Sequence, residues 1–162
     1  VADDSGLVVP ALGGRPGVLS RRCAETHGVV PDEAERDDTN LRLLLEEMTG
    51  LDDSDRRAYY ACVAALAIPR TRFASDPATA SSRDDAIAAA APAVRLFAGT
   101  CDGVIATAPH GSGGFGYDPV FLVPELGLTF GEASPDAKHR LSHRARAFRA
   151  LAACMPAALA PA

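Results

Sequence analysis

The stretch Gly111–Pro119 reads Gly-Ser-Gly-Gly-Phe-Gly-Tyr-Asp-Pro and places four glycines within six residues. So many glycines cannot build a packed core, but they let the backbone adopt positive φ angles and approach a ligand closely. Within the stretch, Phe115 supplies one aromatic face and Asp118 one carboxylate. We interpret it as a binding loop that suits a flat heterocycle better than a bare phosphate.

Two other polar clusters are expected to meet this loop in one nucleotide site. Near the start, Asp3–Gly6 reads Asp-Asp-Ser-Gly and is predicted to turn the chain. Adjacent carboxylates beside a hydroxyl suit Mg²⁺ ligation or activation of water, and a solvated turn is the alternative. Near the end, Ser142 is an N-cap candidate that puts His143 and Arg144 in the first turn of the last helix. Donors there face an anion or a carbonyl.

The glycine spacing by itself matches two common motifs, and both fail on context. Gly111, Gly113 and Gly116 fit the dinucleotide fingerprint and the kinase glycine loop. The dinucleotide motif must open a helix, whereas Val120–Val123 predicts a strand shortly after the loop. A kinase needs catalytic loops further along the chain, and too little chain remains for them.

The composition bounds the class of protein. The chain has 162 residues, 48% of them hydrophobic, which predicts one domain over residues 1–162. The net charge of −5 argues against nucleic acid as a partner, and no apolar run is long enough for a membrane span. Four cysteines without a CxxC pair favour reduced thiols in a cytoplasmic protein: Cys23, Cys62, Cys101 and Cys154.

The first half of the chain predicts a helix and a strand. Leucines and Met48 recur at helical spacing over residues 31–49, so we expect an amphipathic helix there. Asn40 is either a packing group or a helper in the site. The continuous apolar run Ala58–Ile68 predicts a buried central strand. Arg21 and Arg22 could hold phosphates or form a solvated basic face.

The second half predicts a surface segment, a hairpin and two capped helices. Residues 70–92 are small and polar and read as a surface insertion. The strands Val94–Phe97 and Val104–Thr107 are predicted to pair through a turn at the glycines between them. Ser134 is predicted to cap the helix that precedes the Ser142 cap.

At this point the motifs resemble those of a known family, the non-canonical purine NTP pyrophosphatases of the inosine triphosphatase-like group. The resemblance covers nearly the whole chain, and its motifs occur in the right order. It rests on four strings, Ala2–Leu7, Ala11–Val18, Gly111–Pro119 and Ser142–Arg144, and on the family spacing of Thr129-Phe130-x-Glu132 and Lys138.

The resemblance implies an α/β fold, with an elongated mixed β-sheet, flanking helices and two lobes around a nucleotide cleft. It implies a Mg²⁺-dependent homodimer that cleanses the nucleotide pool by hydrolysing ITP, dITP and XTP to the monophosphate and pyrophosphate. Asp4 resembles the general base and a metal ligand, and Asp3 its neighbour at the metal. The substrate contacts implied by the resemblance are Ser5, Phe115, Gly116, Tyr117, Asp118, Lys138, His143 and Arg144.

The chemistry agrees with these roles. Hydrolysis between the α and β phosphates needs an activated water and a cation that neutralises developing charge. His143 and Arg144 can donate to the 6-keto oxygen of hypoxanthine or xanthine. The 6-amino group of adenine would leave donor facing donor, which a buried site discriminates strongly. Phe115 can stack on any base.

Two rival interpretations stay open: a pyrophosphatase of other base specificity, such as one for modified pyrimidines, and a non-catalytic nucleotide-binding module or inactive fragment. The second arises because the chain starts at Val1, and the family's Thr-Gly-Asn-x-x-Lys triphosphate loop is absent from it. We therefore expect an N-terminally truncated domain. His110 and Cys23 also depart from the residues frequent in the family.

Overall fold

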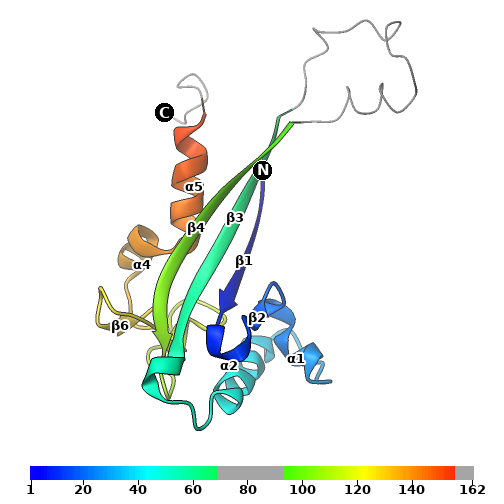
Figure 1. Cartoon of the computed structure of the whole chain (residues 1–162), viewed down its shortest axis with the longest axis vertical. Helices are drawn as coiled ribbons and strands as arrows, with labels where there is room; N and C mark the ends of the chain where they lie inside the picture. The colour runs from blue at the N-terminus through cyan, green and yellow to red at the C-terminus, as the bar shows by residue number, and fades with distance from the viewer. Residues whose placement is uncertain (69–92, 156–162) are drawn as a thin grey trace, which may run out of the picture.

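The computed structural model describes residues 1–68 and 93–155. A six-stranded sheet of order β2-β1-β3-β4-β5-β6 runs through the molecule, and α-helices lie against it (Figure 1). This confirms the α/β class with an elongated sheet and flanking helices. In place of a mixed sheet, each pair of neighbouring strands in the described residues is antiparallel. The strands are β1 (Ala2–Val8), β2 (Pro16–Gly17), β3 (Arg57–Ile68), β4 (Ala93–Ile105), β5 (Phe121–Val123) and β6 (Leu128–Thr129).

The helices gather at two places along the sheet (Figure 1). The helix α5 runs beside β3 and β4, whereas α1 and α2 lie with β2 at the other end of the long strands. The α-helices are α1 (Cys23–Thr26), α2 (Arg36–Glu47), α4 (Pro135–Leu141) and α5 (His143–Ala153), and short 3-10 turns are η1 (Pro10–Leu12), η2 (Ser20–Arg22), η3 (Asp53–Arg56) and η5 (Asp118–Val120).

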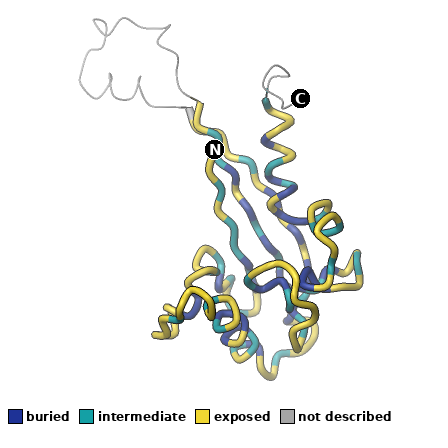
Figure 2. The backbone as a smooth tube through the Cα atoms, turned by 180° about the vertical axis from the view of Figure 1, so that it is seen from behind, coloured by how far each residue is buried: buried dark blue, intermediate teal, exposed yellow. Residues whose placement is uncertain are grey.

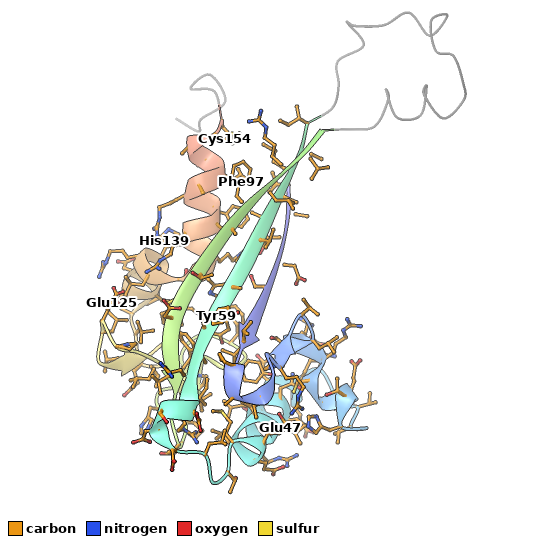
Figure 3. The ribbon with its side chains drawn as sticks, viewed as in Figure 1. Glu47, Tyr59, Phe97, Glu125, His139 and Cys154 are labelled. Carbon is orange, nitrogen blue, oxygen red and sulfur yellow. The ribbon has the colours of Figure 1, made fainter. Side chains whose placement is uncertain are left out.

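Burial changes from residue to residue along the long strands (Figure 2). Alternate residues of a strand point to opposite faces, and Leu7, Tyr60 and Cys62 are buried on the face that we call the inner face. One core there involves α2, β5 and the turn η5. A second core joins the inner face to α5, with Phe97 packed against it (Figure 3). On the opposite, outer face, Val63 is 42% exposed.

The predicted turn at Asp3–Gly6 is wrong, because these residues lie inside β1 and pair with β3. The glycine misled the prediction. A Cβ at Gly6 would lie 2.2 Å from the carbonyl oxygen of Gly17. Gly6 therefore allows a neighbouring loop to approach the strand closely, and it does not turn the chain.

The predicted hairpin between Val94 and Thr107 is also wrong, because β4 is one continuous strand. Its two inner-face glycines serve close contacts. A Cβ at Gly99 would lie 2.3 Å from the backbone oxygen of His143, so Gly99 lets α5 pack directly on the strand. A Cβ at Gly103 would lie 2.5 Å from the ring of Phe121.

Other elements follow the prediction more closely. The strand predicted over Ala58–Ile68 is confirmed as β3, at the centre of the sheet. The helix predicted over residues 31–49 is shorter, Arg36–Glu47. Both caps are confirmed, because Ser134 accepts a hydrogen bond from the backbone of Ala137, and Ser142 one from that of Ala145. The surface insertion predicted at 70–92 lies outside the described residues.

Candidate functional site

Positive φ angles shape the glycine loop. Gly111 has φ 73° and Gly114 has φ 77°. A Cβ at Gly114 would lie 2.0 Å from Oδ2 of Asp118, and one at Gly111 would lie 2.2 Å from the carbonyl oxygen of Gly131. Other residues would be strained and crowded at both positions. The glycines thus let the loop fold tightly over the Asp118 carboxylate.

Asp118 is the buried centre of the loop, with 2% of its surface exposed. Its Oδ2 accepts a hydrogen bond of 2.7 Å from the backbone N–H of Phe115 and an ion pair from the ammonium of Lys138. Burial raises the pKa of the Asp118 carboxyl, and the bonds from Lys138 and Phe115 oppose that rise. Lys138, from α4, also lies 4.6 Å from the centre of the Phe115 ring, which is 68% exposed.

An aromatic stack continues from the loop toward α5. His143 packs parallel to Tyr60, with ring centres 4.6 Å apart, and Tyr60 packs in turn against Phe121 and Phe130. Burial first, and then the positive charges of Lys138 and Arg144, lower the pKa of His143 to about 4. The imidazole is therefore neutral at pH 7 and keeps one N–H donor and one acceptor.

Arg144, in the first turn of α5, reaches across to Asp3 on β1. Arg144 donates to Oδ1 of Asp3 at 3.0 Å, and Asp3 and Ser5 lie on the inner face of β1. Within residues 1–68 and 93–155, two buried side-chain polar atoms find no hydrogen-bond partner, Oγ of Ser5 and Nδ1 of His143. Such atoms are uncommon in folded proteins and are typical of places where a ligand or water binds.

Asp4 lies apart from this group. It pairs with the exposed Val63 on the outer face of the sheet, and its Oδ1 accepts the backbone N–H of Ser5 at 2.9 Å. The strand β2 covers the edge of β1 only at Leu7 and Val8. In the part of the chain that the structure describes, no strand pairs with that edge beside Ala2–Gly6. Asp3 and Asp4 thus point to opposite faces at an unpaired edge.

Of the predicted site residues, the structure brings together Asp3, Phe115, Asp118, Lys138, His143 and Arg144. Ser5 lies on the same face of β1 as Asp3. Tyr117 lies in the core, where its hydroxyl donates to the backbone oxygen of Ser20 at 2.9 Å. Gly116 forms the tip of the loop, with φ 60°. Asp4 stands on the other face.

The sequence did not point to Tyr60 or Asp37. Tyr60 forms the ring surface under His143, and the apolar run of β3 does not signal which of the adjacent Tyr59 and Tyr60 points inward. Asp37, in the first turn of α2, accepts the backbone N–H of Gly116 at 2.7 Å. Nothing in the local sequence signals that contact, because the two residues lie 79 positions apart.

Two further polar groups hold the fold. Asn40 is buried, accepts the N–H of Ala24 at 2.8 Å and donates to Arg21 O, so it is a packing group and not a helper in the site. Arg56 is buried and donates to the backbone oxygens of Met48, Ile105 and Ala106. It links the end of α2 to the end of β4.

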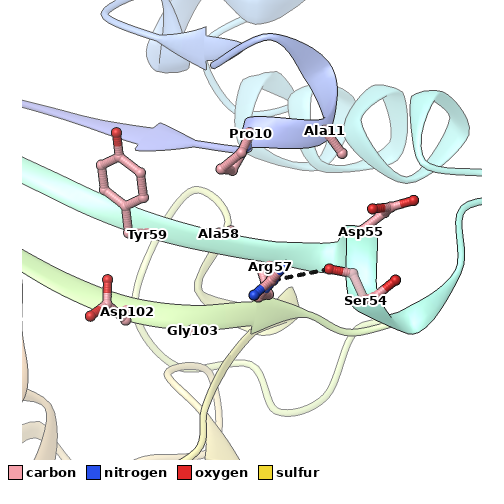
Figure 4. Close-up of a pocket in the computed structure, with 9 residues that line it drawn as sticks. All are labelled: Pro10, Ala11, Ser54, Asp55, Arg57, Ala58, Tyr59, Asp102 and Gly103. Carbon is pink, nitrogen blue, oxygen red and sulfur yellow. Dashed lines mark hydrogen bonds between the residues drawn. The ribbon is translucent and has the colours of Figure 1, made fainter.

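Two of the hollows on the described surface lie near the elements discussed above. One, of about 500 Å³, lies between α2 and the glycine loop and is lined by Asp37, Leu41 and Phe115 among others. The other, of about 400 Å³, lies around the start of β3 and contains none of the predicted site residues (Figure 4). No helix in the described ranges is long and apolar enough to cross a membrane.

The comparisons with known proteins agree with this geometry. A relative from Geobacillus kaustophilus named dITP/XTP pyrophosphatase is 44% identical over 93% of this chain and 60% of its own length. One of the same name from Burkholderia pseudomallei is 45% identical over 94% and 62%. The chain thus spans about three fifths of the length of these curated relatives.

The solved structures point the same way. The Staphylococcus aureus Ham1 protein superposes with a TM-score of 0.68 at 35% identity, over 93% of this chain and 62% of that one. A Ham1 protein from Coxiella burnetii gives the same TM-score at 36% identity, over 93% and 63%. Residues 1–154 match the Ham1 family. The chain therefore belongs to the Ham1 family.

Proposed function

We propose that this chain binds non-canonical purine nucleoside triphosphates, ITP, dITP and XTP, and hydrolyses them to the monophosphate and pyrophosphate. The observation that carries the proposal is the neutral, buried His143, stacked on Tyr60 between Arg144 and the Lys138–Asp118 pair. The two relatives of this chain described above carry the name dITP/XTP pyrophosphatase. The uncovered edge of β1 beside Ala2–Gly6 and the glycine loop would then hold the two ends of one nucleotide.

The base would stack on Phe115, whose exposed ring stands at the tip of the loop. An N–H of His143 and the guanidinium of Arg144 would donate to the 6-keto oxygen. Because the low pKa of His143 keeps the imidazole neutral, it adds a donor without burying a charge. Adenine presents its own donor at that position, so its binding would leave buried donors unpaired.

The reaction would take place at the edge of β1. The Asp4 carboxylate would accept a proton from water as the water oxygen bonds to the α-phosphorus. The bond from that phosphorus to the bridging oxygen then breaks, and pyrophosphate leaves with the bonding electrons. Asp4 suits this role because its side chain is exposed, so water can reach it.

Mg²⁺ fits Asp4 better than Asp3. Among the described residues, no group of three or more His, Cys, Asp or Glu side chains could hold a metal ion. Asp3 is already paired with Arg144 and lies on the inner face. Mg²⁺ commonly binds through one or two carboxylates together with substrate phosphates, so the exposed Asp4 would share the ion with the triphosphate. The bound cation would neutralise charge that develops on the phosphates.

The test is a product assay on the purified chain. ITP, XTP, GTP and ATP are each incubated with and without Mg²⁺, and the nucleotides, pyrophosphate and phosphate are separated. We expect IMP and pyrophosphate from ITP, with ATP nearly unchanged. IDP with phosphate as products, or equal hydrolysis of ATP, would contradict the proposal.

The second candidate is a module that binds nucleotide without hydrolysing it. It is favoured by the position of Asp4 on the face opposite the binding residues. Calorimetric titration with ITP and ATP decides between the two. Selective ITP binding without products would support the module. The homodimer and the cytoplasmic location stay predictions.

A further inference from the structure

The backbone N–H groups of the glycine loop have separate acceptors. Gly113 donates to the carbonyl oxygen of Gly131 at 2.9 Å, and Phe115 donates to Oδ2 of Asp118 at 2.7 Å. Asp118 belongs to the loop itself, and Gly131 follows it in sequence. Gly116 donates at 2.7 Å to Oδ2 of Asp37, which belongs to α2. The tip of the loop is thus held between two carboxylates, that of Asp118 in the loop itself and that of Asp37 in α2.

The Phe115 ring depends on this backbone for its direction. It is 68% exposed, so packing fixes it weakly. Both of its neighbours are glycines with positive φ, Gly114 and Gly116. Glycine gives a backbone more freedom than any other residue. A hydrogen bond on each side of the ring therefore limits a segment that would otherwise be mobile.

We propose that Asp37 is a positioning residue that fixes Phe115 for stacking on the purine. The inference rests on the proposed function, since it assigns to Asp37 a role in the same base site. Asp37 contacts Gly116 and acts on the nucleotide only through the Phe115 ring. A loop already ordered before binding loses less conformational entropy when the nucleotide arrives.

Asp38 provides a matched control. It is the next residue, is exposed like Asp37, and is also an acid in the first turn of α2. Both carboxylates complement the helix dipole, but the contact to Gly116 belongs to Asp37. Asp37→Ala removes the acceptor and the charge, whereas Asp37→Asn keeps an acceptor oxygen and removes only the charge. Asp38→Ala removes the same charge from the helix.

The experiment compares the three variants with the unaltered chain in two measurements. The first is hydrogen–deuterium exchange of the segment 111–119 without nucleotide. The second is the dissociation constant for ITP by calorimetry. We expect Asp37→Ala to speed exchange in the loop and to weaken ITP binding about fivefold to tenfold, as for the loss of one hydrogen bond. Asp37→Asn should recover most of the affinity, and Asp38→Ala should change neither measurement.

Equal effects of Asp37→Ala and Asp38→Ala would overturn the inference, because helix charge would then explain both. Unchanged exchange in Asp37→Ala would overturn it as well. If the unaltered chain binds no ITP, the proposed function fails and the stacking role fails with it. The exchange comparison would still show separately whether Asp37 holds the loop.

Discussion

Two carboxylates of the candidate site, Asp118 and Asp4, lie in opposite environments. Asp118 is 2% exposed and is bonded to Phe115 and Lys138, both within 20 residues of it. Asp4 is exposed on the outer face of β1, beside an edge that no described strand covers there. The first belongs to a binding surface that is built before any ligand arrives, and the second is open to water.

This difference divides the work between the two regions. A buried, paired carboxylate is costly to disturb but does not exchange protons readily, so it suits shape and orientation. An exposed carboxylate contributes little to folding and can meet water and phosphate, so it suits chemistry. If the division is right, substitutions at Asp4 should affect turnover alone, and substitutions around Asp118 should affect folding first.

The largest expected effect is on turnover. Asp4→Asn should lower the kcat for ITP by roughly 10³-fold, in the range for loss of a general base. The dissociation constant for ITP should stay within a few fold, and the free energy of unfolding within about 0.5 kcal/mol. Product assays, calorimetry and urea unfolding measure these quantities. Asp102→Asn, an exposed carboxylate on β4, is the control and should change none of them. Unchanged turnover in Asp4→Asn would remove Asp4 from the reaction.

The next largest effect is on folding. Lys138→Met leaves the Asp118 carboxylate buried without its cation, so the free energy of unfolding should fall by about 3 kcal/mol. Urea unfolding measures the loss. Adding Asp118→Asn to this variant removes the buried charge and should recover part of the stability. Arg140→Met takes a charge from the exposed side of the same helix, and an equal loss there would contradict the special role of the pair.

A pH effect should come from His143. Its pKa is about 4 in the folded chain, below the ordinary value of 6.5. The unfolded chain therefore binds a proton first as the pH falls, and the stability that the neutral imidazole contributes is complete above pH 6.5 and lost between pH 6.5 and 4. Relative to His143→Gln, the unaltered chain should lose about 3 kcal/mol across that window.

His27 makes the comparison with a variant necessary. Its bonds to the Cys23 backbone and to Glu47 raise the pKa of His27. The contribution of His27 is therefore complete below pH 6.5 and is lost as the pH rises through the higher folded value, opposite in sign to that of His143. The unaltered chain and His143→Gln both contain His27. The difference between their free energies of unfolding at each pH therefore does not include the contribution of His27. Parallel curves from pH 6.5 to 4 would contradict a neutral His143.

The sequence predicted those elements that are determined by residues a few positions away in the chain. The caps at Ser134 and Ser142 rest on residues three positions away, and the strand β3 on one continuous apolar run. The sequence likewise predicted that the last helix begins at His143, and its motifs indicated the family. The predictions failed where a distant segment supplies the reason. Gly6 and Gly99 were read as turn residues, but each makes room for backbone from elsewhere in the chain.

The same limit applies to the site. Asp3 and Asp4 were predicted to act together, and adjacency in sequence suggested it. Once the segment is a strand, alternation sends the two carboxylates to opposite faces. Asp37 could not be found by any local pattern, because its partner Gly116 lies in another part of the chain.

The smallest expected effect tests the other ion pair of the site. Arg144 and Asp3 lie 3.0 Å apart, but the Arg144 side chain is 59% exposed, in contrast to the buried Asp118. Water and salt screen such a pair, so a double-mutant cycle of Asp3→Asn and Arg144→Ala should give a coupling of about 0.5 kcal/mol, falling further in 1 M salt. A coupling of about 3 kcal/mol, the size of the loss expected for Lys138→Met, would contradict this. The contact of α5 with β1 through Arg144 and Asp3 would then be as firmly held as the contact of α4 with the glycine loop. A small coupling leaves Arg144 able to exchange Asp3 for the 6-keto oxygen of a purine, and Arg144→Ala should then narrow the preference for ITP over ATP.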